Sequence, residues 1–231
     1  MSLSHSPRIV TDGLVLCLDA GDPKSYPSSG TVWYDRTNRK DNASAINGAF
    51  YQEGSFFLDG VNDYLYLDTS KSLMPNSSLI SITSFVKISN ILSQSIYTET
   101  VDTSAANRFG FVINENNKIR VSGRINDDDA FTIFSLSDDS ISLNEWTHIG
   151  CSCDFTNNIQ RIFINGESVS LTNYGIVGTF DGGDSQTRSI GWNAVSNYFS
   201  GNIANLRVYN RAISPEEAKQ NYNATKGRFG L

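Results

Sequence analysis

The chain has few of the residues on which nucleophilic catalysis and zinc binding depend. Its 231 residues include only 2 histidines and 3 cysteines. A serine or cysteine nucleophile needs an activating base, and only His5 and His148 are available. Two distant histidines and one Cys-x-Cys pair do not supply the four ligands of a zinc site. We therefore interpret His148 as a hydrogen-bonded structural residue and expect neither chemistry.

Long apolar runs and an excess of positive charge are also missing. No stretch approaches the ~18 apolar residues of a membrane span, and MSLSHSPRIV has neither the basic start nor the apolar core of a secretory signal. The formal net charge is −6, which is the wrong sign for a nucleic-acid footprint. We expect no nucleic-acid partner, no membrane insertion, and synthesis and folding in a cytosol.

The cysteines fit a reducing compartment. Cys151 and Cys153 are two apart on one expected strand and share a face, and Cys17 lies in the apolar run LVLCL. Buried, reduced thiols are the expected state. A pairing of Cys17 with either of the other two stays open, because sequence alone does not determine connectivity.

Aromatic residues, glycines and alternating patterns are abundant, with 13 Phe, 10 Tyr and 18 Gly. Short strands separated by Gly and Asn turns predict an all-β, antiparallel two-sheet jelly-roll sandwich. Asn165 and Gly166 favour a type I′ turn in a central hairpin. Ser214, Pro215 and Glu217 have the spacing of a capping box, so we expect one short helix over residues 214–224.

One domain suits this length. We expect an extended N-terminal arm at 1–12, a sandwich domain at 13–222 and a C-terminal tail at 223–231. Apolar residues in both ends, such as Val10 and Phe229, predict contacts with a neighbouring copy or another protein.

Three strings resemble the laminin-G-like, concanavalin A-like lectin and glucanase superfamily. They are FFLDGVNDYLYL at 56–67, NEWTHIGCSCDFTNNIQRIFING at 144–166 and YFSGNIANLRVYNRAISPEE at 198–217. The resemblance implies a concanavalin A-like fold, whereas function has to be argued from the site because this fold hosts unrelated activities.

The resemblance brings a glycoside hydrolase into consideration, and the residues argue against it. Glucanases of this fold place carboxylates in a string close to Glu-x-Asp-x-x-Glu, which is absent here. The nearest approach is Glu99 with Asp102, and a three-residue offset on a strand puts the two on opposite faces. Because cleavage needs two carboxylates across one bond, we expect a protein that is not an enzyme.

Calcium is the metal that the loops suit, because it takes six to eight oxygens from Asp, Asn and backbone carbonyls. Asp59, Asn62 and Asp63 offer such oxygens within five residues, and relatives hold calcium at one rim of the sandwich. The alternative is that these are turn residues whose side chains bond their own backbone. Relatives also read Gly-x-Ile-Asp where this chain has Ala204, which counts against the metal. No other cofactor is expected.

Sugar binding uses flat aromatic rings that stack on a pyranose, with Asn and Asp to reach its hydroxyls. Trp33, Tyr34, Trp192 and Tyr198 are the candidates, because each lies in or beside a loop-rich segment that also carries Asn or Asp. The alternative is that they are core residues, with Trp33 pinning its long loop.

Both ends of the chain, GLVLCLDAGDPKSYPSSGTVWYD at 13–35 and ISPEEAKQNYNATKGRFGL at 213–231, resemble virion-associated lectin-like proteins of tailed bacteriophages and marine viruses. That resemblance implies a virion protein assembled in the host cytoplasm. Its implied partners are other virion proteins or copies of itself, as a trimer in a fibre or vertex, and host-surface glycan. The function we expect is non-catalytic virion structure or decoration. A secreted carbohydrate-binding adhesin is the alternative, and a glucanase-like hydrolase is the third reading.

Overall fold

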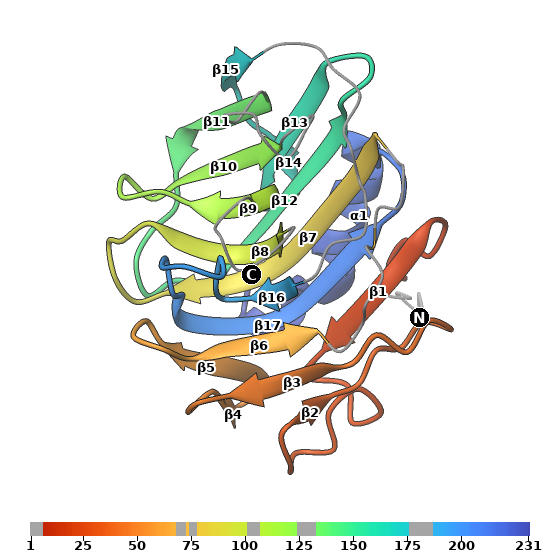
Figure 1. Ribbon diagram of the computed structural model, residues 1–231. Coiled ribbons are helices and arrows are strands. Elements are labelled where there is room, and N and C mark those ends of the chain that lie inside the picture. Colours follow the sequence, from red (N-terminus) through yellow and green to blue (C-terminus); the bar gives the residue numbers. More distant parts are fainter. Residues whose placement is uncertain (1–6, 68–72, 74–77, 101–106, 124–132, 176–186) are drawn as a thin grey trace.

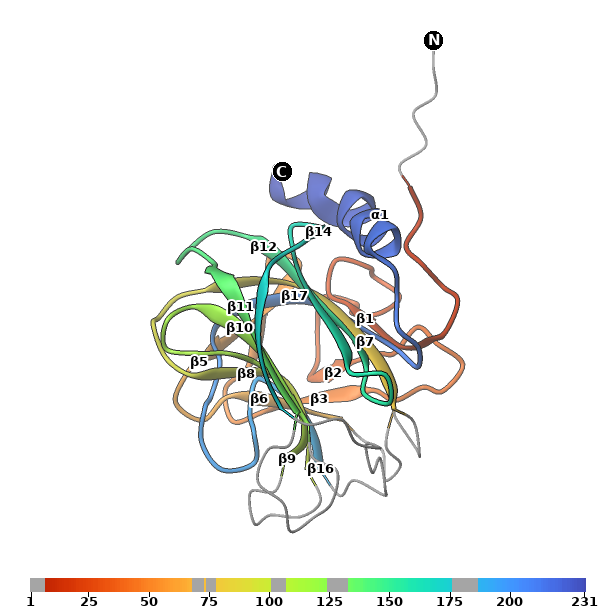
Figure 2. The same cartoon turned by 90° about the horizontal axis from the view of Figure 1, so that it is seen from above.

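The computed structural model describes residues 7–67, 73, 78–100, 107–123, 133–175 and 187–231. Two antiparallel β-sheets pack face to face, and one helix near the C-terminus lies on the outside of one sheet (Figure 1; Figure 2). The predicted all-β antiparallel sandwich with one short C-terminal helix is confirmed. No helix among the described residues is both long and apolar enough to cross a membrane.

The eight-stranded sheet carries the predicted central hairpin. Asn165 and Gly166 have φ of 50° and 79°, the positive values that a type I′ turn requires, but their turn joins the second strand of that hairpin to the two-residue edge strand Glu167–Ser168. In spatial order this sheet consists of β14 (Glu167–Ser168), β13 (Ile159–Ile164), β12 (Thr147–Asp154), β7 (Leu79–Ile88), β17 (Ser200–Tyr209), β5 (Ser55–Asp59) and β4 (Phe50–Gln52), with β1 (Leu14–Asp19) paired to the second half of β17.

The nine-stranded sheet includes β2, which lies in the turn-rich segment around Trp33. In spatial order it consists of β15 (Leu171–Gly175), β11 (Ile133–Ser140), β10 (Lys118–Gly123), β9 (Asn107–Ile113), β8 (Gln94–Thr100), β16 (Thr187–Ile190), β6 (Tyr64–Leu67), β3 (Ala43–Ile46) and β2 (Val32–Trp33). The loop after β2 is folded around Asp35, whose carboxylate accepts backbone N–H groups of Cys17, Thr37 and Asp41.

The core lies between the sheets and is built from alternate strand positions. On β6, Leu65 and Leu67 are fully buried, so Tyr64 and Tyr66 lie on the outer face of their sheet. Cys151 and Cys153 belong to this core. All three cysteines are buried and free, which confirms the predicted thiols.

The outer face of the eight-stranded sheet is covered by α1 (Pro215–Thr225) and the 3₁₀ helix η1 (Lys226–Phe229). Ser214 and Glu217 form the predicted capping box. Residues 1–6 of the predicted arm lie outside the described residues. The described part of the arm packs on α1 and β17. Val10 N donates to Asn221 Oδ1 at 2.9 Å, and Tyr209 OH donates to Val10 O at 3.1 Å.

Candidate functional site

Two of the predicted sugar-binding aromatics meet beside the ends of β16 and β6, which are neighbouring strands of the nine-stranded sheet. Trp192 and Tyr198, both in the loop between β16 and β17, stack with ring centroids 5.9 Å apart and planes 9° from parallel. Tyr64 of β6 joins them, with its ring centroid 4.7 Å from that of Trp192. All three side chains are half-buried, so each keeps part of its surface in contact with solvent. We call this set, with the neighbouring Tyr66, the aromatic cluster.

Tyr64 interacts electrostatically with the other two tyrosines of the aromatic cluster. Burial raises the pKa of Tyr64 above its usual value, and the neighbouring Tyr198 and Tyr66 raise it further. The Tyr64 phenol therefore retains an O–H that can donate a hydrogen bond as well as accept one. The cluster combines ring surface with several donors and acceptors.

Small hydroxyl residues hold the loop that carries this cluster. Thr98 Oγ1 and Ser189 Oγ both donate to the carbonyl oxygen of Trp192, at 2.6 and 2.7 Å. Farther along the loop, Ser95 N donates to Asn197 O at 3.0 Å. Thr98 and Ser189 are register partners on β8 and β16, so the two strands fix the position of Trp192 together.

A hollow of about 370 Å³ adjoins the cluster, and Gly60, Leu92, Ser93 and residues 195–198 line it. Its surroundings are unusually apolar for a loop surface, since Val61 is 69% exposed and Val195 is 55% exposed. Apolar surface beside converging hydroxyls matches the two kinds of surface that a pyranose presents. The arrangement can therefore bind a sugar by stacking and hydrogen bonding.

The other two predicted aromatics do not belong to this site. The prediction for Trp33 is wrong, because its side chain is 0% exposed and packs on Phe56 in the core, with ring centroids 4.9 Å apart. Tyr34 is 44% exposed but follows β2, the edge strand, and within the described residues no ring contact joins it to the cluster. The buried Trp33 side chain instead anchors β2 to the core.

The predicted calcium ligands form a self-bonded turn beside the hollow. Asp59 Oδ1 accepts the backbone N–H groups of Val61, Asn62 and Asp63, and Asp63 Oδ2 accepts that of Asp59. Despite partial burial, these N–H groups hold the pKa of Asp59 below its usual value. In the described part of the chain no three Asp, Glu, His or Cys side chains gather to hold a metal. The geometry fits the turn and not a full calcium site, and calcium binding stays a prediction.

His148 and Glu99 are both buried, and neither faces the hollow. His148 is structural, but the expectation of a hydrogen-bonded ring is wrong: both ring nitrogens are buried without a partner, since the ring lies against Phe85. Glu99 faces the interior and accepts Tyr97 OH at 2.6 Å and Leu73 N at 3.2 Å. Asp102 and His5 lie outside the described residues.

Sequence reasoning missed Tyr64 and Tyr66. The string YLYL at 64–67 carries the signal, because alternation with two buried leucines places both tyrosines on the outer face. Their partnership with Trp192 depends on the pairing of β6 with β16, which brings together segments more than 120 residues apart.

Comparison with curated proteins finds no match. Among solved structures, Trypanosoma rangeli sialidase in complex with the inhibitor DANA has a TM-score of 0.67 and 17% identity, over 97% of this chain and 36% of that chain. The ligand binding domain of botulinum neurotoxin serotype D, in complex with N-acetylneuraminic acid, has a TM-score of 0.62 and 14% identity, over 93% of this chain and 51% of that chain. The chain thus spans about a third of the length of the sialidase and about half of the neurotoxin domain structure.

A third structure covers nearly its own whole length. Ruminococcus gnavus IT-sialidase CBM40, bound to α2,3-sialyllactose, has a TM-score of 0.52 and 15% identity, over 67% of this chain and 94% of that chain. At such identities these similarities show the fold. The sequence itself matches a family over residues 59–219, which is more than half of the chain. This chain therefore belongs to the concanavalin A-like lectin/glucanases superfamily.

Proposed function

We propose that this protein is a non-catalytic glycan-binding module and that the aromatic cluster is its binding site. The observation that carries the proposal is the meeting of Tyr64, Trp192 and Tyr198 beside an open hollow. Two proteins of the same fold support it, since one was solved with N-acetylneuraminic acid and the other with α2,3-sialyllactose.

The proposal includes no glycoside cleavage, because the carboxylate pair of a glucanase is missing from the sequence. The chain has no Glu-x-Asp-x-x-Glu string, and Glu99, the nearest approach to one, turns into the core and bonds Tyr97 there. Glucanases cleave with two carboxyl groups about 5 to 9 Å apart across the bond. The aromatic cluster itself contains no carboxylate, so its chemistry is recognition.

We further propose that the module is displayed on a virus particle, as a structural or decoration protein that contacts host-surface glycan. The support is the resemblance of residues 13–35 and 213–231 to virion-associated lectin-like proteins. Imaging of the particle at a resolution that distinguishes side chains tests this placement. Density for this fold on the particle surface supports it, whereas secretion of the free protein by a cell would favour the adhesin.

Retention on immobilised sialylated and neutral oligosaccharides tests the site. We expect Trp192→Ala to weaken binding about tenfold, because one stacked ring contributes about 1 kcal/mol or more. Tyr64→Phe removes one hydroxyl and should weaken it less. Tyr34→Ala is the matched control, since Tyr34 is exposed but lies away from the cluster. Equal retention of Trp192→Ala and the wild type would reject the site.

New reducing ends in proportion to added protein would reject the non-catalytic assignment.

A further inference from the structure

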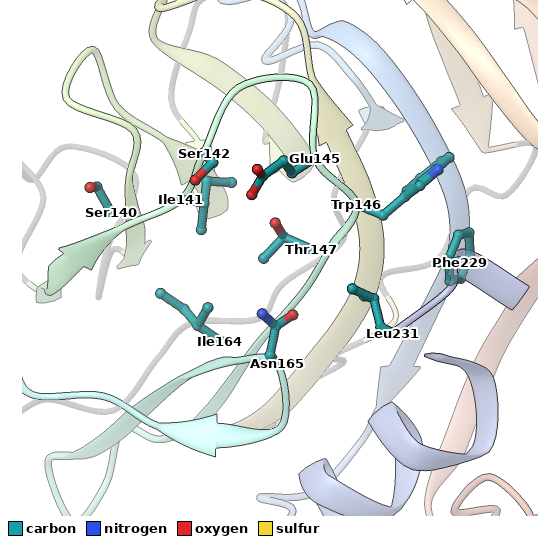
Figure 3. A pocket seen from close by; sticks show the side chains of 10 residues that line it. All are labelled: Ser140, Ile141, Ser142, Glu145, Trp146, Thr147, Ile164, Asn165, Phe229 and Leu231. Carbon is teal, nitrogen blue, oxygen red and sulfur yellow. The ribbon is translucent and has the colours of Figure 1, made fainter. Parts of the chain in front are cut away.

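A second hollow lies on the other sheet, where the sequence analysis predicts no site. Its volume is about 460 Å³. Its walls come from three segments: residues 140–147 before and within β12, the turn between β13 and β14, and the C-terminal residues 229 and 231 (Figure 3). We call it the C-terminal groove. The volume falls in the range of about 300 to 1,000 Å³ that is typical of small-ligand sites.

Three polar side chains that can still form hydrogen bonds with a ligand lie along the middle of the C-terminal groove. Figure 3 shows Glu145, Thr147 and Asn165 in a row between its two apolar sides. Thr147 is only 6% exposed. Within the described residues, the side chains of Glu145 and Thr147 make no hydrogen bond. Asn165 accepts His148 N through Oδ1 at 3.0 Å, which leaves its amide N–H groups for another partner.

The Thr147 hydroxyl opens into the groove and makes no hydrogen bond within the described residues, so it is free to bond a ligand. The three side chains together offer one carboxylate acceptor, one hydroxyl and one amide donor. That set matches a ligand with several adjacent hydroxyl groups.

The sides of the groove are apolar. Ile141 and Ile164 lie on one side, and Leu231 and Phe229 lie on the other (Figure 3). Trp146 packs against Phe229 with ring centroids 4.6 Å apart. A pyranose ring presents apolar C–H groups between its hydroxyls, so both kinds of wall can be used at once.

We propose that the C-terminal groove binds a neutral hexose or N-acetylhexosamine unit, as a second carbohydrate site on the sheet opposite the aromatic cluster. Glu145 accepts hydroxyl protons, Asn165 donates to a ring or hydroxyl oxygen, and Thr147 does either. The unpaired carboxylate of Glu145 disfavours an acidic sugar by repulsion. The argument uses no residue of the aromatic cluster, so it stands or falls independently of the proposed function.

Nuclear magnetic resonance titration of the whole chain tests this site. The probes are the methyl glycosides of N-acetylglucosamine and glucose, with N-acetylneuraminic acid as the acidic sugar. We expect millimolar binding of a neutral glycoside, with shifts at the Trp146 indole and at Thr147 and Asn165. Thr147→Val keeps the shape of the side chain and should weaken binding about threefold to tenfold. Glu145→Gln should weaken it similarly, and Glu53→Gln, an exposed glutamate on another turn, is the matched control.

Each outcome decides the proposal. Shifts confined to the groove, and reduced in Thr147→Val and Glu145→Gln but not in Glu53→Gln, support it. No shift in the groove at tens of millimolar neutral glycoside overturns it, as do groove shifts with N-acetylneuraminic acid that equal those with the neutral sugars. Shifts only at Trp192 and Tyr64 would leave the proposed function intact and reject the groove. Shifts only in the groove would support the groove and reject the aromatic cluster as the binding site.

Discussion

His148 is a buried histidine whose surroundings strongly disfavour the charged ring. It is a residue of β12 and lies fully buried, with its ring centroid 4.9 Å from that of Phe85 on β7 and 5.8 Å from that of Tyr222 on α1. Burial, and then the positive charge of Arg207, lower its pKa to about 3. A histidine in an unfolded chain has a pKa near 6.5, so folding strongly disfavours the protonated ring.

This difference predicts a loss of stability in acid. Because the folded pKa lies below the unfolded one, the contribution of His148 is complete above about pH 6.5 and falls as the pH drops toward 3. The slope over that window is about 1.4 kcal/mol per pH unit. Urea unfolding of the wild type and of His148→Gln between pH 6.5 and 4.5 measures it. The wild-type free energy of unfolding should fall more steeply than that of the variant, and parallel curves would contradict the assignment.

At the scale of elements, α1 illustrates what a local signal determines. Ser214 Oγ accepts the backbone N–H of Glu217, and the Glu217 carboxylate accepts Ser214 N at 2.9 Å. The same carboxylate also receives both terminal nitrogens of Arg211. The start of α1 is therefore tied to the end of β17 as well as capped.

Loss of the cap should destabilise the molecule by a modest and measurable amount. Ser214→Ala leaves the N–H of Glu217 without its acceptor, and we expect about 1 kcal/mol lower stability and a Tm about 2 to 4 °C lower. Glu217→Gln keeps an acceptor for Ser214 N but removes the charge that pairs with Arg211. Thermal unfolding with calorimetry measures both. A Tm for Ser214→Ala equal to that of the wild type would show that Glu217 and Arg211 hold α1 without the cap.

Local patterns were sufficient for the helix, the central hairpin and the fold class, because each depends on residues near in sequence. They were not sufficient for β2, which has two residues inside a turn-rich segment and is held by Trp33 and Asp35 through contacts with distant strands. The same difference between local and long-range signals applies to the aromatic cluster. Trp192 and Tyr198 share one loop and could be predicted together, whereas Tyr64 reaches them only through the pairing of β6 and β16.

At the scale of the molecule, the described parts of both chain ends pack on their own domain. Phe229 stacks on Phe85 with ring centroids 4.3 Å apart, and Val10 is buried against α1. The apolar ends that suggested contacts with a neighbouring copy are therefore largely satisfied within one chain. Self-association, including the trimer implied by the resemblance, stays a prediction that sedimentation can test.

The two proposed sites are built from different side chains, and two sites on one molecule predict cross-linking. One molecule can hold two polysaccharide chains, one at the aromatic cluster and one at the C-terminal groove. Each contact alone should be weak, with a Kd of about 1 mM or about 4 kcal/mol, so binding strength comes from many linked contacts.

Light scattering of the monomer mixed with a long mixed glycan, containing both sialylated and neutral units, measures this cross-linking. We expect scattering to rise for the wild type and for Tyr34→Ala. It should fall for Trp192→Ala and for the double variant Glu145→Gln with Thr147→Val, although each of these variants keeps one site and still binds the polymer. The reason is that a particle with one site cannot join two chains. If either single-site variant cross-links as well as the wild type while sedimenting as a monomer, the two-site arrangement is wrong. If it does so as an oligomer, self-association supplies the second contact instead.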